Sequence, residues 1–254
     1  MKRYWIISAG LLLIAPAVLG AEAASRPAAE GFPLPQLPSP MATGAALQWL
    51  ALVTVLAIAP AVLVMVTCFT RIIVVLGLLR QALASPQLPP NQVLFGLALL
   101  MTAVVMAPVY RDVHREAISP YVSGQVSAAA AWQAGEKHLR GFMIRQVEAC
   151  GNEGDVYPFL EGELAQRKDL AWGDVPTISL IPAFVVSELK TAFVIGFRIY
   201  LPFVIIDMLV ASVLMSMGML MLPPVLISMP FKLLLFVLAD GWRLVVATLM
   251  KSFG

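Results

Sequence analysis

Charged residues are scarce in this sequence. Only 13% of its 254 residues are Asp, Glu, Lys or Arg, whereas 60% are hydrophobic. Ordinary soluble domains contain about a quarter charged residues. The composition therefore indicates a membrane protein, or a protein packed within a membrane-associated assembly. The net charge of +2 is too small to indicate nucleic acid or an anionic substrate as a partner.

Cysteine and histidine are also rare. Cys68 lies in an apolar run and Cys150 in a polar region, so we expect no disulfide between them, and no metal-binding Cys/His spacing occurs. The only histidines, His114 and His138, belong to no HExxH motif, and GxSxG and P-loop motifs are absent. The sequence therefore predicts neither an enzyme nor a metal or cofactor site.

The first residues have the pattern of a secretory signal peptide. Lys2 and Arg3 precede an apolar stretch that is short for a transmembrane helix, and residues 21–23 match an A-x-A cleavage site. We expect residues 1–23 to be removed; the alternative is an uncleaved anchor. Residues 24–44 are then expected to form a Pro-rich linker.

Two apolar blocks surround one polar segment, which predicts an all-α membrane protein. Residues 45–110 predict a first helical hairpin around the turn "ASPQLPPNQ", and residues 175–254 predict a second hairpin. Residues 111–174 carry most of the charge and predict a small helical insert. Its apolar residues have helical spacing; they are Leu139, Phe142, Met143 and Val147. Because a signal peptide and one hairpin precede the insert, we expect it on the extracytoplasmic side.

The first block is too long for a single membrane crossing. A continuous helix over residues 45–83 would be about twice as long as a ~30 Å hydrocarbon core. We therefore expect the helix to break near Pro60 or Gly77, or to extend beyond the lipid. Arg71 and Arg80 flank the following turn and are expected to face the cytoplasm.

Charged residues interrupt the last block, where each costs about 2.5 to 3.5 kcal/mol at mid-membrane unless it is paired or solvated. They are Glu188, Lys190, Arg198, Asp207, Lys232, Asp240 and Arg243. Asp240 and Arg243 have the i, i+3 spacing of a pair within a helix. We expect Glu188 to pair with the isolated Lys232, between helices or between subunits. The alternative is that Lys232 reaches an interface with water.

Four methionines alternate with other residues in "MSMGMLMLPP". They are Met215, Met217, Met219 and Met221. In a helix, residues i and i+2 point about 200° apart, whereas alternate side chains of an extended segment share one side. We expect a loop that presents thioethers in one direction, with Gly218 as its hinge and Pro223 and Pro224 fixing the start of the next helix. From the residues alone, packing in a helix–helix core is the preferred alternative.

Several long segments resemble the FliP/SctR family of type III secretion export-gate proteins. They are "CFTRIIVVLGLLRQAL" (68–83), "PPNQVLFGLALLMT" (89–102), "EKHLRGFM" (136–143), "PAFVVSELKTAFVIGF" (182–197) and "LPFVIIDMLVASVLMSMGMLMLPPVLISMPFKLLLFVLADGW" (201–242). The resemblance covers essentially all of residues 45–250. One departure is Val194, at a position where the family pattern leads us to expect a polar residue such as Gln.

The resemblance implies a non-enzymatic core subunit of the flagellar export gate, needed for flagellum assembly, in the bacterial inner membrane and the flagellar basal body. It implies a pentamer-like homo-oligomer that joins FliQ, FliR and other export-apparatus proteins around a channel for unfolded flagellar subunits. It also implies that the methionine loop forms a gasket in that channel, which reverses the preference for core packing. Two alternatives remain: a subunit of a virulence injectisome, and a small ion-coupled transporter, for which no internal repeat is visible.

Overall fold

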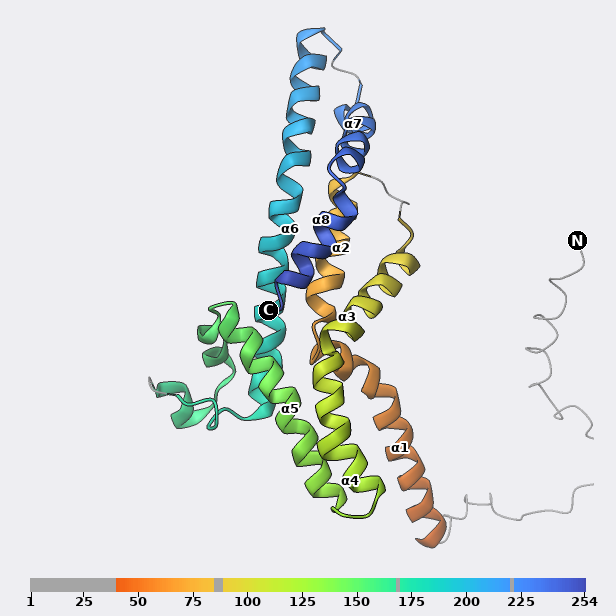
Figure 1. The fold of residues 1–254 in the computed structure, drawn as a ribbon, viewed down its shortest axis with the longest axis vertical. Helices are drawn as coiled ribbons and strands as arrows, with labels where there is room; N and C mark the ends of the chain where they lie inside the picture. The colour runs from red at the N-terminus through yellow and green to blue at the C-terminus, as the bar shows by residue number, and fades with distance from the viewer. Residues whose placement is uncertain (1–39, 85–88, 168–169, 220–221) are drawn as a thin grey trace, which may run out of the picture. The chain divides into compact units, whose positions relative to one another are not determined.

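The computed structural model describes residues 40–84, 89–167, 170–219 and 222–254, and all regular structure in these ranges is helical (Figure 1). The expectation of an all-α protein is therefore confirmed. The predicted signal peptide and the linker up to residue 39 lie outside the described residues. The chain consists of two compact units, residues 1–51 and residues 52–254, and the second contains nearly all of the described helices.

The elements follow one another as long helices with a group of short ones in the middle of the sequence. They are α1 (Pro40–Met65), α2 (Phe69–Ala82), α3 (Asn91–Val113), the π-helix η1 (His114–Ile118), α4 (Ser119–Val122), α5 (Ala128–Ala149), the 3-10 helices η2 (Glu153–Phe159) and η3 (Gly162–Gln166), α6 (Thr177–Ser216), α7 (Pro224–Leu238) and α8 (Gly241–Lys251). Three helices are long and apolar enough to cross a membrane, or four if the bent pair α7 and α8 is one span.

The break between α1 and α2 lies at residues 66–68, and the expectation of a break near Pro60 or Gly77 is wrong. At the break, threonine hydroxyls form hydrogen bonds with backbone N–H and C=O groups, in addition to the backbone–backbone bonds of the helices. Thr67 Oγ1 accepts from the Phe69 N–H at 3.4 Å, and Thr70 Oγ1 donates to the Val64 carbonyl at 3.2 Å. Pro60 stays inside α1, which continues past it.

The core forms where α2 packs between α6 and α3 (Figure 1). One face of α2 is buried with helical spacing, through Ile72, Val75, Leu76 and Leu79. At the crossing with α6, a side-chain atom on Gly196 would overlap Leu78. Glycine therefore allows the two helices to approach closely at this point.

The polar insert contains one long helix, α5, which packs on α6 and on η1. Phe142, Met143 and Val147 are buried and Leu139 packs against the same core, so the predicted amphipathic helix is confirmed. Ser127 caps its start by accepting from the Ala130 N–H at 3.3 Å.

The last block contains three helices rather than the expected two, because α7 and α8 meet at an angle of 65°. Asp240 at this elbow has a left-handed backbone, with φ of 49°. The Phe236 ring packs edge-on against Trp242 and also covers Gly241, where it leaves no room for a side chain. The ring packing and the left-handed residue together end α7 and start α8 in a new direction.

Candidate functional site

The end of α6 is a tight turn that contains the predicted methionines, and we call residues Met215–Met219 the methionine turn. Gly218 has φ of +73°, a left-handed conformation that glycine adopts without a steric penalty. The Met219 N–H donates to the Leu214 carbonyl and the Gly218 N–H donates to the Met215 carbonyl, each at 3.0 Å. This is a Schellman motif, which satisfies the last carbonyls of a helix. Gly218 therefore ends α6 and turns the chain, and its role as a hinge stays a prediction.

The methionines are placed differently from a fully extended loop. Met215 lies in the last turn of α6 and Met217 is its C-cap. The expectation that alternate methionines share one side of an extended segment is therefore wrong for these two. Helix propagation explains the difference, because the ladder of α6 continues until glycine ends it. Met215, Met217 and Met219 are nevertheless exposed, with 60%, 66% and 39% of their surface accessible. Met221 lies outside the described residues.

The double proline starts the returning helix, as predicted. Pro223 is the N-cap and Pro224 is the first residue of α7. Proline suits this position because its missing N–H would be unpaired there in any case. The helix therefore restarts within a few residues of the methionine turn, and α6 and α7 form a hairpin.

An ion pair joins the two helices of this hairpin. Lys232 Nζ lies 2.6 Å from Asp207 Oδ2, and the lysine side chain is only 2% exposed. Ser228 Oγ donates a hydrogen bond to the other carboxylate oxygen of Asp207. Both oxygens of the carboxylate are thus partnered, which offsets part of the cost of removing these charges from water.

A second ion pair is completely buried between α2 and α6. Arg71 Nε donates to Glu188 Oε2 at 2.8 Å, Nη2 bonds Oε1, and neither side chain is exposed. Nη2 also donates to Gln146 Oε1 of α5 at 3.2 Å, and Nη1 donates to the Ser252 carbonyl at 2.6 Å. The Phe253 ring lies 4.2 Å from Arg71 Cζ. We call Arg71, Gln146, Glu188, Ser252 and Phe253 the Arg71 cluster.

These two pairs correct the predicted ion pairing. The structure pairs Glu188 with Arg71 and Lys232 with Asp207, so the expected pair between Glu188 and Lys232 is wrong within the chain. Arg71 is buried in the core rather than exposed beside the turn, so it does not act as a solvent-exposed flank of that turn. One signal was present in the sequence: five apolar residues, 72–76, follow Arg71 directly, whereas an exposed flank would be followed by polar residues.

The remaining charges of the last block lie at the surface of the chain. Lys190 is 3.6 Å from Asp155 of η2, and Arg243 is 3.8 Å from Asp240, which confirms the expected i, i+3 pair. Arg198 is exposed and forms no ion pair within the described ranges. Val194 is also exposed. Among the described residues, the buried side-chain oxygen without a hydrogen-bond partner is Asp155 Oδ2, while the other oxygen of that carboxylate faces Lys190.

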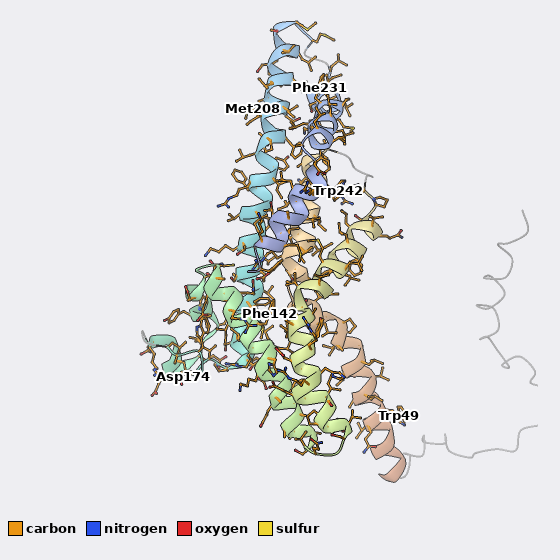
Figure 2. All side chains as sticks on the ribbon, in the orientation of Figure 1. Trp49, Phe142, Asp174, Met208, Phe231 and Trp242 are labelled. Carbon is orange, nitrogen blue, oxygen red and sulfur yellow. The ribbon has the colours of Figure 1, made fainter. Side chains whose placement is uncertain are left out.

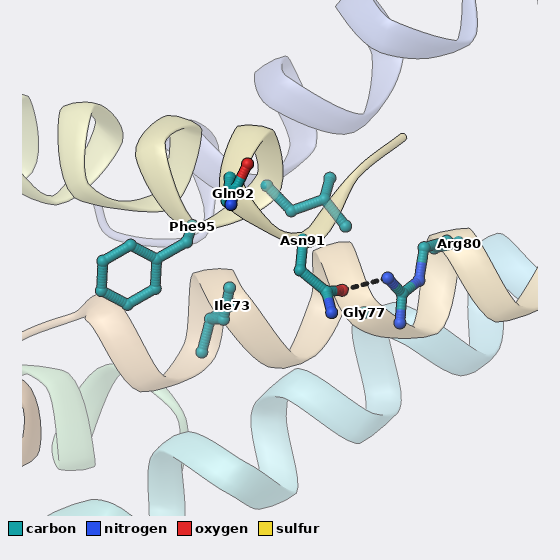
Figure 3. A pocket seen from close by; sticks show the side chains of 7 residues that line it. Ile73, Gly77, Arg80, Asn91, Gln92 and Phe95 are labelled. Atoms are coloured by element: carbon teal, nitrogen blue, oxygen red, sulfur yellow. Dashed lines mark hydrogen bonds between the residues drawn. The ribbon is translucent and has the colours of Figure 1, made fainter. Parts of the chain in front are cut away.

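An apolar groove of about 560 Å³ lies between α2 and α3 (Figure 3). Its lining residues are Ile73, Gly77, Arg80, Asn91, Gln92, Leu94 and Phe95. Arg80 Nη1 donates to Asn91 Oδ1 at its edge. The groove includes none of the predicted site residues, and in the described part of the chain no three His, Cys, Asp or Glu side chains gather in a way that could hold a metal ion.

Cys68 is an inert thiol at the edge of the core. It lies at the break between α1 and α2, outside the membrane-length helices, and has no exposed surface. Burial raises the pKa of the Cys68 thiol to about 12, although a hydrogen bond with Thr102 opposes this shift. Cys150 is half-buried, and both cysteines are free. The expectation of no disulfide between them is therefore confirmed.

Comparison with known proteins identifies the family. The profile of the FliP family matches residues 52–249, which is most of the chain. The chain belongs to the FliP family. It is 48% identical to the flagellar biosynthetic protein FliP of Bacillus subtilis over 204 residues, and this alignment covers 80% of this chain and 90% of that protein. It is 47% identical over 253 residues to FliP of Pectobacterium carotovorum, which covers 99% of this chain and 93% of that protein.

Family membership agrees with the helical fold. FliP proteins are non-enzymatic membrane components of the flagellar export apparatus. The membrane-length helices of this chain agree with a multi-pass protein of the inner membrane. A more distant relative, FliP of Aquifex aeolicus, is still 43% identical over 201 residues, covering 79% of this chain and 82% of that protein.

Proposed function

We propose that this FliP-family chain is a core subunit of the flagellar type III export gate. Several copies, in a pentamer-like ring with FliQ and FliR, enclose a channel through which unfolded flagellar subunits leave the cell. The ring also contacts other export-apparatus and basal-body proteins. The relatives reported above are flagellar proteins by name, which favours this proposal over an injectisome subunit.

The observation that supports a channel role is the exposure of the methionine turn. Three methionines lie at the end of a helical hairpin and are exposed there, Met219 the least. Copies of the turn in a ring would meet at the centre, with Met221 as a fourth member. Methionine suits such a constriction because its unbranched side chain repacks around different shapes without exposing polar groups. A hydrophobic constriction excludes ions by dewetting and yields to a passing polypeptide.

The ion pair behind the turn supports the same role. Asp207 and Lys232 join α6 to α7 below the turn, and Ser228 holds the second oxygen of the carboxylate. A hairpin held in this way resists separation of its helices when a substrate pushes against the methionines. Gly218 then provides the local movement, because the hairpin itself stays closed.

Ion leakage through the assembled complex tests the proposal. We expect replacement of the four methionines by alanine to raise the conductance of membranes that contain the complex, while the complex still assembles with FliQ and FliR. Met208→Ala is the matched control, because Met208 is exposed on α6 but lies outside the turn (Figure 2). An unchanged conductance in the fourfold variant, with normal assembly, would contradict the role of the methionines.

A further inference from the structure

The two residues after α8, which we call the 252–253 segment, contact side chains that come from distant parts of the sequence. The Ser252 carbonyl accepts from Arg71 Nη1 at 2.6 Å, and Ser252 Oγ lies 3.2 Å from the same nitrogen. The Phe253 carbonyl accepts from Gln146 Nε2 at 3.2 Å. The segment is thus bound by α2 and by α5 of the polar insert.

The guanidinium of Arg71 contacts Glu188 and the 252–253 segment through different atoms, and Nη2 also lies within hydrogen-bond distance of Gln146 and Cys150. The edge formed by Nε and Nη2 binds both oxygens of Glu188. The remaining nitrogen, Nη1, and the flat face of the group contact the 252–253 segment. Arginine can do this because its donors form a rigid planar fork whose face also stacks on aromatic rings. Removal of the segment would therefore leave the pair between Arg71 and Glu188 intact.

The segment also fixes the far end of α8. At its near end, α8 leaves α7 at 65°, through the left-handed Asp240 and the packed ring of Phe236. At its far end, the helix is followed directly by the 252–253 segment and its hydrogen bonds to Arg71 and Gln146. Between these ends, Val245 and Leu249 bury one face of α8 in the core, and the hydrogen bonds of the segment add an attachment to α5.

We propose that Arg71 and Gln146 form a binding site for the 252–253 segment, and that this segment is a latch that positions α7 and α8 against the polar insert. The latch is separable from the core beneath it. When it is released, the ion pair of Arg71 and Glu188 persists, while α8 loses its attachment to α5. The proposal does not depend on the channel role of the methionine turn.

Cys150 is a native reporter of the latch. Its Sγ lies 3.5 Å from Arg71 Nη2, and the residue is half-buried beside the site that the segment occupies. Release of the segment opens this site and exposes the thiol to a maleimide. Cys68 is the internal reference, because it is fully buried in the core and reacts only when the core itself opens.

The test measures the rate at which N-ethylmaleimide labels Cys150 in the full-length chain in native membranes, with a Cys150→Ser variant to assign the signal. Phe253→Ala removes the ring that covers the guanidinium, and we expect the labelling rate to rise roughly tenfold, which corresponds to ~1.4 kcal/mol in the opening equilibrium. Phe253→Tyr keeps the ring and should restore the original rate. Lys251→Ala is the control, because Lys251 is exposed and adjacent in sequence.

A second variant weakens the latch from the other side. Gln146→Glu keeps an acceptor for Arg71 but replaces the donor to the Phe253 carbonyl with a negative charge, so it should also raise the labelling rate of Cys150. Faster labelling of Cys150 with unlabelled Cys68 supports the latch. Unchanged labelling of Cys150 in both variants would overturn it. Labelling of both cysteines would overturn it too, because the segment would then be part of the core rather than a separable latch.

Discussion

The two halves of α6 differ in how they are stabilised. From Thr177 to Gly196 the helix contributes most of its buried residues, packs against α2 and α5, and contains the buried Glu188. Beyond Gly196, only Phe203 and Leu214 are buried, and large apolar side chains such as Met208 and Leu209 are exposed. The same helix thus belongs to a folded core over one half and to an uncovered apolar hairpin over the other.

This difference shows which half of α6 is stabilised by contacts within the chain and which half needs contacts with lipid or with other chains. The first half has internal partners for its polar groups, including a buried carboxylate. The second half has one internal ion pair, between Asp207 and Lys232, and apart from Arg198 it presents mostly apolar surface. Contiguous exposed apolar surface of this kind is typical of contact with lipid or with other chains. A subunit of an assembly needs both regions, one to fold and one to associate.

The largest expected effect is on the core half. Arg71→Leu leaves Glu188 buried without its counter-charge, and removing one partner of a buried pair costs about 3–5 kcal/mol. We expect the free energy of unfolding in detergent to fall by about this amount. Replacing both residues by leucine should cost clearly less, because no unpaired charge remains.

Denaturant unfolding of the purified chain measures both variants. Arg198→Leu is the matched control, because Arg198 lies in the other half of α6 and is exposed without an ion pair in the described ranges. Its unfolding midpoint should stay close to that of the original chain. A double variant as unstable as the single one would show that packing, rather than charge pairing, stabilises this half.

The second-largest expected change in the free energy of unfolding comes from replacing Gly196, which is closely packed, and Gly77 provides a comparison because it has open space around it. A side chain on Gly196 would overlap Leu78 and approach its Cβ to 3.1 Å, so Gly196→Ala should lower the free energy of unfolding by about 1–3 kcal/mol. Gly77 lies within α2 and has open space around it. Gly77→Ala should therefore stabilise the chain by about 0.5–1 kcal/mol, because alanine favours the helix. Thermal unfolding in detergent compares the two, and shifts of the same sign would contradict the close packing of α2 on α6.

The sequence predicted well those features that depend on neighbouring residues. The periodicity of α5, the glycine at the turn after α6 and the double proline at the start of α7 are local signals, and the structure contains each of them. The helix does not break at Pro60, as the sequence suggests, but after Met65, where the hydroxyls of Thr67 and Thr70 form hydrogen bonds with the backbone. The local cost of Pro60 is real, but the packing of α2 and the side-chain hydrogen bonds decide where the helix ends.

The ion pairs could not be predicted in the same way. Arg71 and Glu188 lie 117 residues apart, and hydrophobic periodicity shows which face of a helix is buried but not which helix covers it. The charges of the last block do not include Arg71, so they suggest Lys232 as the partner of Glu188, whereas the actual partner lies on α2. The elbow at Asp240 is also hard to predict, since aspartate adopts a left-handed backbone more often than most residues but still in only a small share of cases.

The smallest expected effect is on the methionine turn. Gly218→Ala forces a side chain into the left-handed region, which costs about 1–2 kcal/mol. Because this turn lies in the half of α6 with few buried residues, we expect the cost to appear as local opening rather than as loss of the core. Amide exchange near Met217 and Met219 should speed up, while the unfolding midpoint of the core changes little. Gly218→Asn is the control, since asparagine tolerates this conformation better. If Gly218→Ala lowers the midpoint as much as Gly196→Ala does, the two halves of α6 unfold as one unit and the distinction between them fails.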